Sequence, residues 1–491
     1  MKNILVLGGG TAGLIAALMI KSKHPSYGIT IIKSDDVGII GVGEGTTEHW
    51  SHFVNSIGLN IREVITETDA TFKSGIFYEE WTKDPYFHVI TDQMSSMKYG
   101  QYKIGYASAI GSNLNNFDVT PSYIVDGIIG EDFLPNQYHF NTFKLNEYLI
   151  KICEQRKINI INDSINDVEV DNGKITSITG SGTYSADFYI DCTGFKRVLI
   201  GKLNSEFISC EDRTFVNEAI AFQTDDLENY NPYTISRAMN SGWLWRIPTY
   251  GRHGNGYVFN NNFITADEAI KEVEDLYGHK ISVAKNIKFE TGYLKDSWIG
   301  NCCAVGLSSG FFEPLEATSI ASTIQQTFLI LNSISTYDEQ SIIDFNKKLR
   351  NIYSNILDFV QLSYMCGKED TPFWQMVKEQ FNPTDQLKYI LDVAQKRLPI
   401  YENFDQSYLI FTEDNFIVKL HALGLLNLKN IKNEYEEVNE LARNHFQEEL
   451  NNYQDFKKSS KKMKHKDMLD LIRSNKDNFY GIIDNTIKET A

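Results

Sequence analysis

The sequence predicts an α/β fold with a Rossmann-type core, mixed β-sheets around it and a mainly helical C-terminal region. Residues 4–7 form a short apolar run typical of a central parallel strand, and a glycine-rich turn and a helical stretch over residues 14–23 follow it. A second apolar run at residues 29–32 completes the opening of a β-α-β unit. From about residue 320 onward helical periodicity dominates. We therefore expect a core at residues 1–330 and a helical region at 331–491.

Between these landmarks the patterns predict several further elements. A strand is expected over residues 72–81, a helix over 143–155, a hairpin around the Asp-Asn-Gly turn at 171–173 and a strand at 188–192. Residues 215–300 indicate a mixed β region, and a helix is expected to start at about Thr318. Residues 90–135 are rich in Tyr, Ser and Gly and match no single pattern.

The bulk composition excludes some classes of protein. The 491 residues are 42% hydrophobic and carry a formal net charge of −17, which argues against a general nucleic-acid binder because such a protein needs a basic face. No apolar stretch reaches the roughly 18 residues of a membrane helix. The six cysteines show no metal-binding spacing, so we expect a cytoplasmic protein with reduced thiols and no metal site.

A glycine motif at the N-terminus predicts a dinucleotide site. Gly8, Gly10 and Gly13 form G-x-G-x-x-G directly between the first strand and its helix, where glycine permits close approach of a pyrophosphate to the backbone and the helix N-terminus attracts it. The second strand ends at Lys33, where an acidic residue would usually bind the ribose. Asp35 or Asp36 is a possible substitute.

Several segments together resemble the flavin-dependent tryptophan halogenase family. They are GVGEGT at residues 41–46, ATFKSG at 70–75, DFYIDCTGF at 187–195, WLWRIP at 243–248 and GLSSGFFEPLEAT at 306–318, with a weaker match in DTPFW at 370–374. The resemblance covers most of residues 1–330. Related monooxygenases and the phenol and pyrrole halogenases usually carry Gly-Asp in place of Gly306-Leu307, which favours the tryptophan-type branch.

The resemblance implies an FAD-binding core of the GR2-like monooxygenase kind. It also implies a halogenase that uses FADH2, oxygen and a halide (chloride, bromide or iodide) on an electron-rich, indole-like aromatic compound. Reduced flavin would come from a separate flavin reductase, since no second G-x-G-x-x-G lies between a strand and a helix, and a homodimer is plausible. The cofactor contacts that we expect are Gly8, Gly10, Thr11, Ala12, Gly13, Gly43, Glu44, Gly45, Thr46, Asp191 and Leu307.

The same resemblance assigns the chemistry. Lys73 would hold hypohalous acid, either by a hydrogen bond from its ammonium or as a haloamine, although a lysine on a strand is ordinarily a solvent-facing residue. Glu316 would orient the halogen, stabilise the cationic ring and accept its proton, with Glu313 as a less favoured stand-in. Thr318 and Ser319 would bind halide at a helix start. Trp243, Trp245 and Pro248 would form a wall between flavin and substrate. His88, which follows Tyr86-Phe87, is a less favoured candidate for the substrate pocket.

Two alternatives stay open at this point. An FAD monooxygenase would hydroxylate an aromatic substrate without need of halide. A flavin-binding protein without catalysis would act as a carrier or partner, a hypothesis that Lys33 and the residues around Ala317 allow. The two tryptophans also fit an ordinary hydrophobic core.

Overall fold

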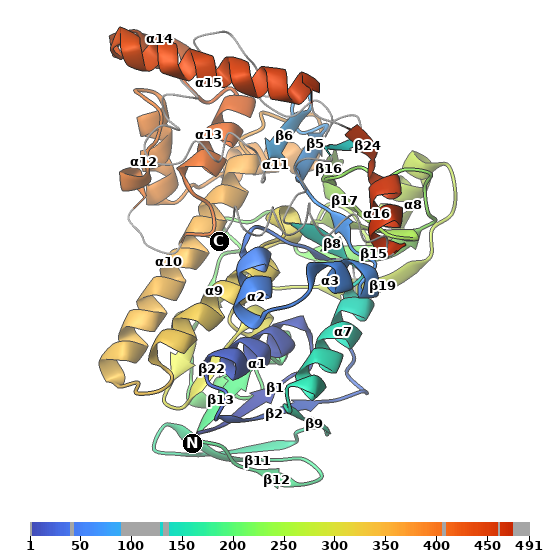
Figure 1. Cartoon of the computed structure of the whole chain (residues 1–491), viewed down its shortest axis with the longest axis vertical. Coiled ribbons are helices and arrows are strands. Elements are labelled where there is room, and N and C mark those ends of the chain that lie inside the picture. The colour runs from blue at the N-terminus through green and yellow to red at the C-terminus, as the bar shows by residue number, and fades with distance from the viewer. Residues whose placement is uncertain are drawn as a thin grey trace.

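The computed structural model describes residues 2–39, 44–89, 128–130, 137–404, 409–459 and 462–474. Figure 1 shows a parallel sheet with its helices in the lower half of the molecule and a large mixed sheet at the upper right. Most of the C-terminal helices lie at the top and left, and the last one lies at the right. Gly43, the side chain of Glu44 and most of the region 90–135 lie outside the described residues. Within the described part, no helix is both long and apolar enough to span a bilayer.

The parallel sheet confirms the predicted Rossmann-type core. Its order is β21-β22-β13-β1-β2-β9, in which all neighbours are parallel except the pair β21 and β22. Helix α1 follows β1 and packs against α7 and α9. The bounds are β1 Asn3–Leu7, α1 Thr11–Lys23, β2 Gly28–Lys33, α7 Thr142–Gln155, β9 Asn159–Asn162, β13 Phe188–Asp191, β21 Trp298–Ile299 and β22 Cys302–Ala304.

A small hairpin sheet lies below the core in Figure 1. Asn172 and Gly173 both have positive φ, of 47° and 74°, as a two-residue type I′ turn requires, so the predicted hairpin is confirmed. Its strands are β10 Asp167–Asp171, β11 Lys174–Thr179 and β12 Thr183–Tyr184.

The large mixed sheet lies beside the core, at the upper right in Figure 1. Its order is β19-β15-β18-β17-β16-β5-β6, antiparallel except where β5 joins β16. Helix α8 packs on β15 and β18 through Ala269 and Val273. The bounds are β5 Gly75–Glu79, β6 Tyr86–Val89, β15 Glu218–Thr224, β16 Thr234–Met239, β17 Gly242–Thr249, β18 Arg252–Phe259, α8 Ala266–Tyr277 and β19 Val283–Lys288.

The strand predicted over residues 72–81 was wrong in one respect, because the structure divides it. The backbone N–H of Lys73 donates to Gln137 O and that of Ser74 to Pro232 O, so the chain leaves one sheet at Phe72 and joins another at Gly75. The remaining short elements are β3 Glu44–Gly45, α2 His49–Ile57, α3 Ile61–Glu67, β4 Thr71–Phe72, β7 Ile128–Gly130, β8 Tyr138–Phe140, η2 Gly194–Lys196, η3 Ile200–Leu203, β14 Phe207–Ser209, β20 Gly292–Leu294, η4 Gly306–Ser308, β23 Gly310–Phe311, η5 Pro314–Glu316 and β24 Lys462–Lys464.

Helices dominate the chain after residue 317, as predicted. Residue 330 itself lies inside α9, and one hydrophobic core contains residues from both sides of it, including Ile324, Leu349 and Phe416. The division of the chain at residue 330 remains a prediction. The helices are α9 Thr318–Ser333, α10 Glu339–Ser363, α11 Pro372–Gln380, α12 Asp385–Ala394, η6 Tyr401–Asn403, α13 Glu413–Ala422, α14 Leu428–Glu437, α15 Glu440–Ser459 and α16 His465–Arg473.

Candidate functional site

The turn between β1 and α1 requires glycine at two positions. A Cβ atom at Gly8 would lie 2.3 Å from the carbonyl oxygen of Cys192, and one at Gly13 would lie 2.0 Å from that of Gly8. Gly10 is the N-cap of α1, has no side-chain cap, and borders open space. The first N–H groups of α1 therefore face a space in which an anion can approach the backbone.

A large pocket opens at this turn, with a volume of about 920 Å³. Its walls come from the glycine turn, the ends of β2 and β13, the faces of β17 and β19, and the start of α9. Lys285 on β19 donates a hydrogen bond to Ile39 O, which joins the large sheet to the segment after β2. The size, the glycine turn and the helix N-terminus fit a flavin dinucleotide.

The structure offers a candidate for the acidic ribose ligand that is missing at Lys33. Asp35 lines the pocket, forms an ion pair with Lys33, and accepts a hydrogen bond from Asn162 Nδ2 at 2.6 Å. Asp36 does not line the pocket.

Some predicted cofactor contacts have a different place. Asp191 is fully buried, and its two carboxylate oxygens accept hydrogen bonds from Thr193, Leu199, Ile200 and Ser308. These bonds fix the turn after β13. The pocket is lined by residues of that turn, Cys192, Thr193 and Gly194, and not by Asp191. Gly13 packs α1 on β1, and Thr46 contacts Lys73. The predicted contacts that do line the pocket are Gly8, Gly10, Thr11, Ala12, Gly45 and Leu307.

Lys73 is fully buried in the break between β4 and β5. Its Nζ donates a hydrogen bond to Thr46 O at 2.9 Å. Burial lowers the pKa of Lys73 to about 8, against the opposing influence of the Glu316 charge. A Cβ atom on Gly45, which lines the pocket, would lie 3.3 Å from Lys73 Nζ. The amine therefore lies next to Gly45, just outside the lining of the pocket.

Glu316, in η5, is also fully buried, and its carboxylate is closely surrounded. One oxygen accepts hydrogen bonds from the Tyr78 hydroxyl and the Lys419 ammonium, and the other lies 2.9 Å from His88 Nδ1. Burial opposes ionisation of Glu316, but the positive charge of Lys419 and the contact with His88 outweigh it and hold the pKa of Glu316 well below its usual range.

Glu313, three residues earlier, has the opposite character. Both of its carboxyl oxygens lie 3.0 Å from the Tyr364 hydroxyl, and burial raises the pKa of Glu313 to about 8. At neutral pH Glu316 is ionised and Glu313 is protonated, which separates the roles of the two carboxyl groups.

Sequence reasoning missed Lys419. It lies on α13 and is fully buried, with Nζ bonded to Glu316 and to Ser363 Oγ at 2.8 Å and placed 3.7 Å from the centre of the Phe359 ring. A signal for it was present, because Lys419 interrupts the apolar run from Phe416 to Leu420. A single lysine within such a run is costly to bury unless it is paired.

The start of α9 borders the pocket. Ala317 precedes it in the left-handed region, with φ of 54°, and no side chain caps the helix. Ala317 and Ser319 line the pocket, whereas Thr318 is buried and does not. The helix N-terminus supplies N–H groups that suit a small anion.

The strand β17 forms another wall. Trp243, Trp245 and Ile247 alternate along β17 and all face the pocket. A Cβ atom on Gly256 would lie 2.0 Å from the Trp245 ring, so the glycine leaves room for the indole. Pro248 was also predicted for this wall. It lies outside the pocket lining, on the opposite face by alternation, and its carbonyl accepts a hydrogen bond from Thr71 Oγ1 at 2.6 Å.

The sequence model that describes tryptophan halogenases matches residues 3–437. The chain belongs to the tryptophan halogenase family. It is accordingly an enzyme of the flavin-dependent halogenase type, an oxidoreductase.

Individual relatives are similar along almost their whole length. Tryptophan 7-halogenase RebH of Lentzea aerocolonigenes is 28% identical over 482 residues, covering 87% of this chain and 90% of the relative. A solved tryptophan halogenase of Shewanella frigidimarina superposes with a TM-score of 0.89 at 23% identity, covering 97% of this chain and 98% of that one. A tryptophan C-6 flavin-dependent halogenase of taromycin biosynthesis gives 0.88 at 25% identity, with 96% and 100% covered.

In this family member, a residue near the C-terminus supports the strand before Lys73. His465, at the start of α16, accepts a hydrogen bond from the backbone N–H of Phe72 at Nε2, at 3.0 Å. Burial lowers the pKa of His465 to about 3, so the ring is neutral and can accept this bond. The backbone next to Lys73 is therefore bonded to a residue 393 positions further along the chain.

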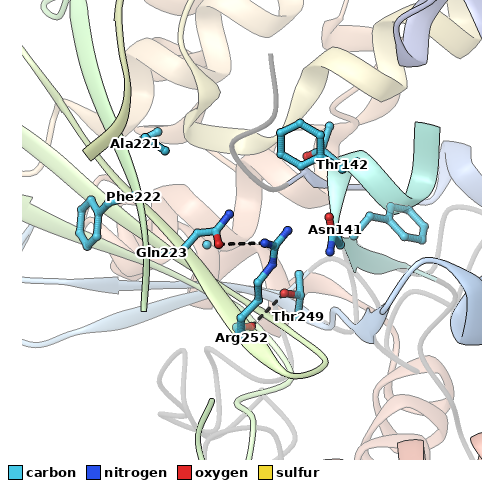
Figure 2. A pocket seen from close by; sticks show the side chains of 11 residues that line it. Asn141, Thr142, Ala221, Phe222, Gln223, Thr249 and Arg252 are labelled. Atoms are coloured by element: carbon cyan, nitrogen blue, oxygen red, sulfur yellow. Dashed lines mark hydrogen bonds between the residues drawn. The ribbon is translucent and has the colours of Figure 1, made fainter. Parts of the chain in front are cut away.

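A second, much smaller cavity lies beside the large pocket (Figure 2). Its volume of about 20 Å³ has room for about one water molecule. Figure 2 shows Arg252 bonded to Gln223 at one side, with Asn141 and Thr142 opposite. Asn141 Oδ1 is buried and accepts no hydrogen bond from the described residues, so a water molecule there would satisfy it.

Proposed function

We propose that this enzyme halogenates an indole-like or tryptophan-like aromatic substrate with reduced FAD, oxygen and a halide ion. The observation that carries the proposal is the place of Lys73, whose buried amine lies next to Gly45, just outside the lining of a pocket that fits FAD. When bound, reduced FAD would activate oxygen and so allow halide to be oxidised to hypohalous acid. Hypohalous acid would pass from this pocket to the Lys73 amine beside Gly45, the lining residue next to the amine.

The flavin itself would be held by the glycine turn and its neighbours. Gly8, Gly10 and the first turn of α1 would bind the pyrophosphate. Asp35 would bind the ribose, because Lys33 occupies the position where an acidic residue usually does so. Since the sequence offers one such turn, we propose that a separate flavin reductase supplies reduced FAD. The halide would bind at the start of α9, near Ser319.

Lys73 and Glu316 would act in sequence on the halogen and on the ring. Lys73 would hold the hypohalous acid facing the substrate. Glu316 would stabilise the positive charge that develops on the ring, because its carboxylate stays ionised. A carboxylate bonded to Lys419 and His88 is a weak base, which favours this electrostatic role over proton abstraction.

The wall of tryptophans favours halogenation over hydroxylation. Trp243 and Trp245 line the flavin pocket, while Lys73 and Glu316 lie buried outside that lining. An aromatic substrate placed next to Lys73 would be separated from the flavin. A monooxygenase would need direct contact between the two.

The test combines turnover with two matched lysine variants. The protein is incubated with FAD, a general flavin reductase, NADH, oxygen, a panel of indoles and phenols, and one halide at a time, with a scavenger for free hypohalite. We expect a halogen mass shift that depends on halide, disappears in Lys73→Ala, and persists in Lys2→Ala, whose side chain bonds Ile334 O away from the pocket. Oxygenated product in the absence of halide would support a monooxygenase and overturn the proposal, as would the absence of any product.

A further inference from the structure

The buried site contains more positive charge than the proposed chemistry uses. Lys73 and Lys419 are both fully buried. Of the two nearby glutamates, Glu316 is ionised at neutral pH and Glu313 is protonated. A second buried lysine is costly unless it has a specific partner. The contacts of the two lysines show how they share this one negative charge.

Lys419 is the direct ion-pair partner of the Glu316 carboxylate. Its Nζ forms an ion pair with Glu316, is bonded to Ser363 Oγ at 2.8 Å, and lies 3.4 Å from the Tyr78 hydroxyl. The second oxygen of Glu316 is occupied by His88, which Asn415 on α13 contacts from the other side at 3.2 Å. Both oxygens of Glu316 are therefore already engaged.

Lys73 receives an uncharged partner instead. Its hydrogen bond goes to the backbone carbonyl of Thr46, and among the described residues it forms no ion pair. The ionisable groups whose charges interact with it are Glu316, His88 and His139, and burial lowers the pKa of both histidines, so the two rings are neutral. An ammonium at this position would be a buried charge without a direct counter-ion.

We propose that Lys419 is a positioning residue that holds Glu316 as its own counter-ion, so that Lys73 releases its proton more readily and its neutral form can meet hypohalous acid. The inference rests on the proposed function and deepens it. A neutral amine can attack the halogen, forming an N–X bond while the O–X bond breaks. The departing hydroxide takes a proton from the nitrogen, so the products are the haloamine of Lys73 and water.

The groups that face this pair from each packed element agree with the assignment. Tyr78 on β5 and Tyr86 on β6 remain protonated because burial raises the pKa of each well above its ordinary value. Glu313, at the start of the turn that holds Glu316, has a pKa of about 8 and is therefore protonated at neutral pH. The charge balance of the cluster therefore depends on Lys419, Glu316 and Lys73.

The experiment measures the proton affinity of Lys73 without turnover. Cyanate is a small reagent that carbamylates unprotonated amines, and peptide mass spectrometry gives the extent at Lys73 relative to a surface lysine. Between about pH 6 and 10, we expect half-maximal modification near the pKa of about 8 in the natural protein. In Lys419→Met, Glu316 loses its partner and stabilises the ammonium of Lys73, so the midpoint should rise by about one pH unit or more.

Three further variants separate charge from structure. Lys419→Arg keeps the charge and Ser363→Ala removes a neutral contact, so neither should move the midpoint. Glu316→Gln should lower it, because the opposing negative charge is gone. The double variant Glu316→Gln with Lys419→Met should return it close to the natural value. Because it removes both members of the ion pair together, it leaves no unpaired Glu316 carboxylate and replaces the single Lys419→Met variant if that one fails to fold.

Two failures remain distinguishable. Absence of halogenated product from the natural protein would overturn the proposed function, whereas the cyanate profile would still measure what Lys419 does. If product forms and the midpoint for Lys419→Met coincides with that of the natural protein, this inference alone is wrong. Equal shifts in Lys419→Met and Lys419→Arg would assign a purely structural role to Lys419 and overturn it too.

Discussion

The Nζ atom of Lys73 donates its hydrogen bond to the carbonyl oxygen of Thr46, 2.9 Å away. A carbonyl accepts a hydrogen bond from an ammonium and from a neutral amine alike. Lys73 can therefore lose its proton without loss of its position. Thr46 directly follows Gly45, so the same short segment borders the flavin pocket and orients the lysine.

Replacement of Lys73 by methionine should stabilise the fold while it removes the activity. The pKa of Lys73 is about 8 in the folded protein and 10.5 for an ordinary lysine, so below pH 8 folding buries a charge. The unfolded chain binds more protons than the folded chain between pH 8 and 10.5, and stability contributed through this group rises across that window. We expect Lys73→Met to raise the melting temperature at pH 7 by the equivalent of up to roughly 3 kcal/mol. The gain should shrink toward pH 10, and a gain independent of pH would contradict the assignment.

The two glutamates of the η5 turn should respond differently to amide substitution. Glu313→Gln should keep most of the activity at pH 7, because glutamine resembles the protonated acid. Glu316→Gln should lower kcat by about 100-fold or more, because it removes a charge that the cationic ring needs. Steady-state kinetics on both variants decides, and equal losses would contradict the separation of roles.

Glu313 also predicts a pH dependence of stability. Its folded pKa is raised from 4.5 to about 8, so from pH 4.5 to 8 the unfolded chain releases a proton that the folded chain retains. The natural protein should lose stability over this range, by at most about 1.4 kcal/mol for each step of one pH unit. Glu313→Gln lacks the group, so its melting temperature relative to the natural protein should increase between pH 5 and 8. Thermal unfolding at several pH values measures this, and a constant difference would show that Glu313 is already ionised in the folded state.

Gly45→Ala should interrupt the connection between the pocket and Lys73. The added methyl group would lie 3.3 Å from Lys73 Nζ and 3.4 Å from Ala317 Cβ, so the space between them would close. We expect FAD binding to persist while halogenated product per oxygen consumed falls several-fold. Gly201→Ala is a suitable control, because its nearest neighbour would be 3.9 Å away. Unchanged coupling in Gly45→Ala would show that the halogen takes another path.

Asp35 and Asp36 provide a matched pair for the cofactor. Asp35 lines the pocket and Asp36 does not, although they are adjacent and carry the same charge. Asp35→Ala should raise the Kd for FAD by about tenfold, as expected for loss of a hydrogen bond to a charged group. Asp36→Ala should leave it unchanged. Fluorescence titration with FAD measures both, and equal effects would indicate general electrostatics rather than a specific contact.

The sequence predicted those parts of the fold and of the site that depend on local chain geometry. The turn at Gly8 and Gly13 is specified by steric crowding, and the hairpin at Asn172 by backbone preference, so both follow from short segments. The segment at Lys73 was harder, because the strand breaks where two distant carbonyls, those of Gln137 and Pro232, accept its backbone hydrogen bonds.

Other features depended on contacts between distant segments. Lys419 pairs with Glu316 across 103 positions, a contact that no local pattern encodes. Asp191 ends a strand like a cofactor ligand, but five donors from its own turn and from η4 occupy its oxygens. Pro248 belongs to the expected signature, yet the alternation of β17 directs it away from Trp245 and the pocket.

The bond between His465 and Phe72 has a consequence for biosynthesis of the enzyme. The residues that line the large pocket all lie between Leu7 and Thr323, so a growing chain contains them well before α16 has been made. The strand before Lys73 can pair with β8 earlier, but it gains its hydrogen bond to His465 only after the ribosome has added α16. The order of synthesis thus makes the lining of the pocket available before the partner of Phe72, so a nascent chain that bound flavin early, as the proposed function allows, would still lack the hydrogen bond next to Lys73.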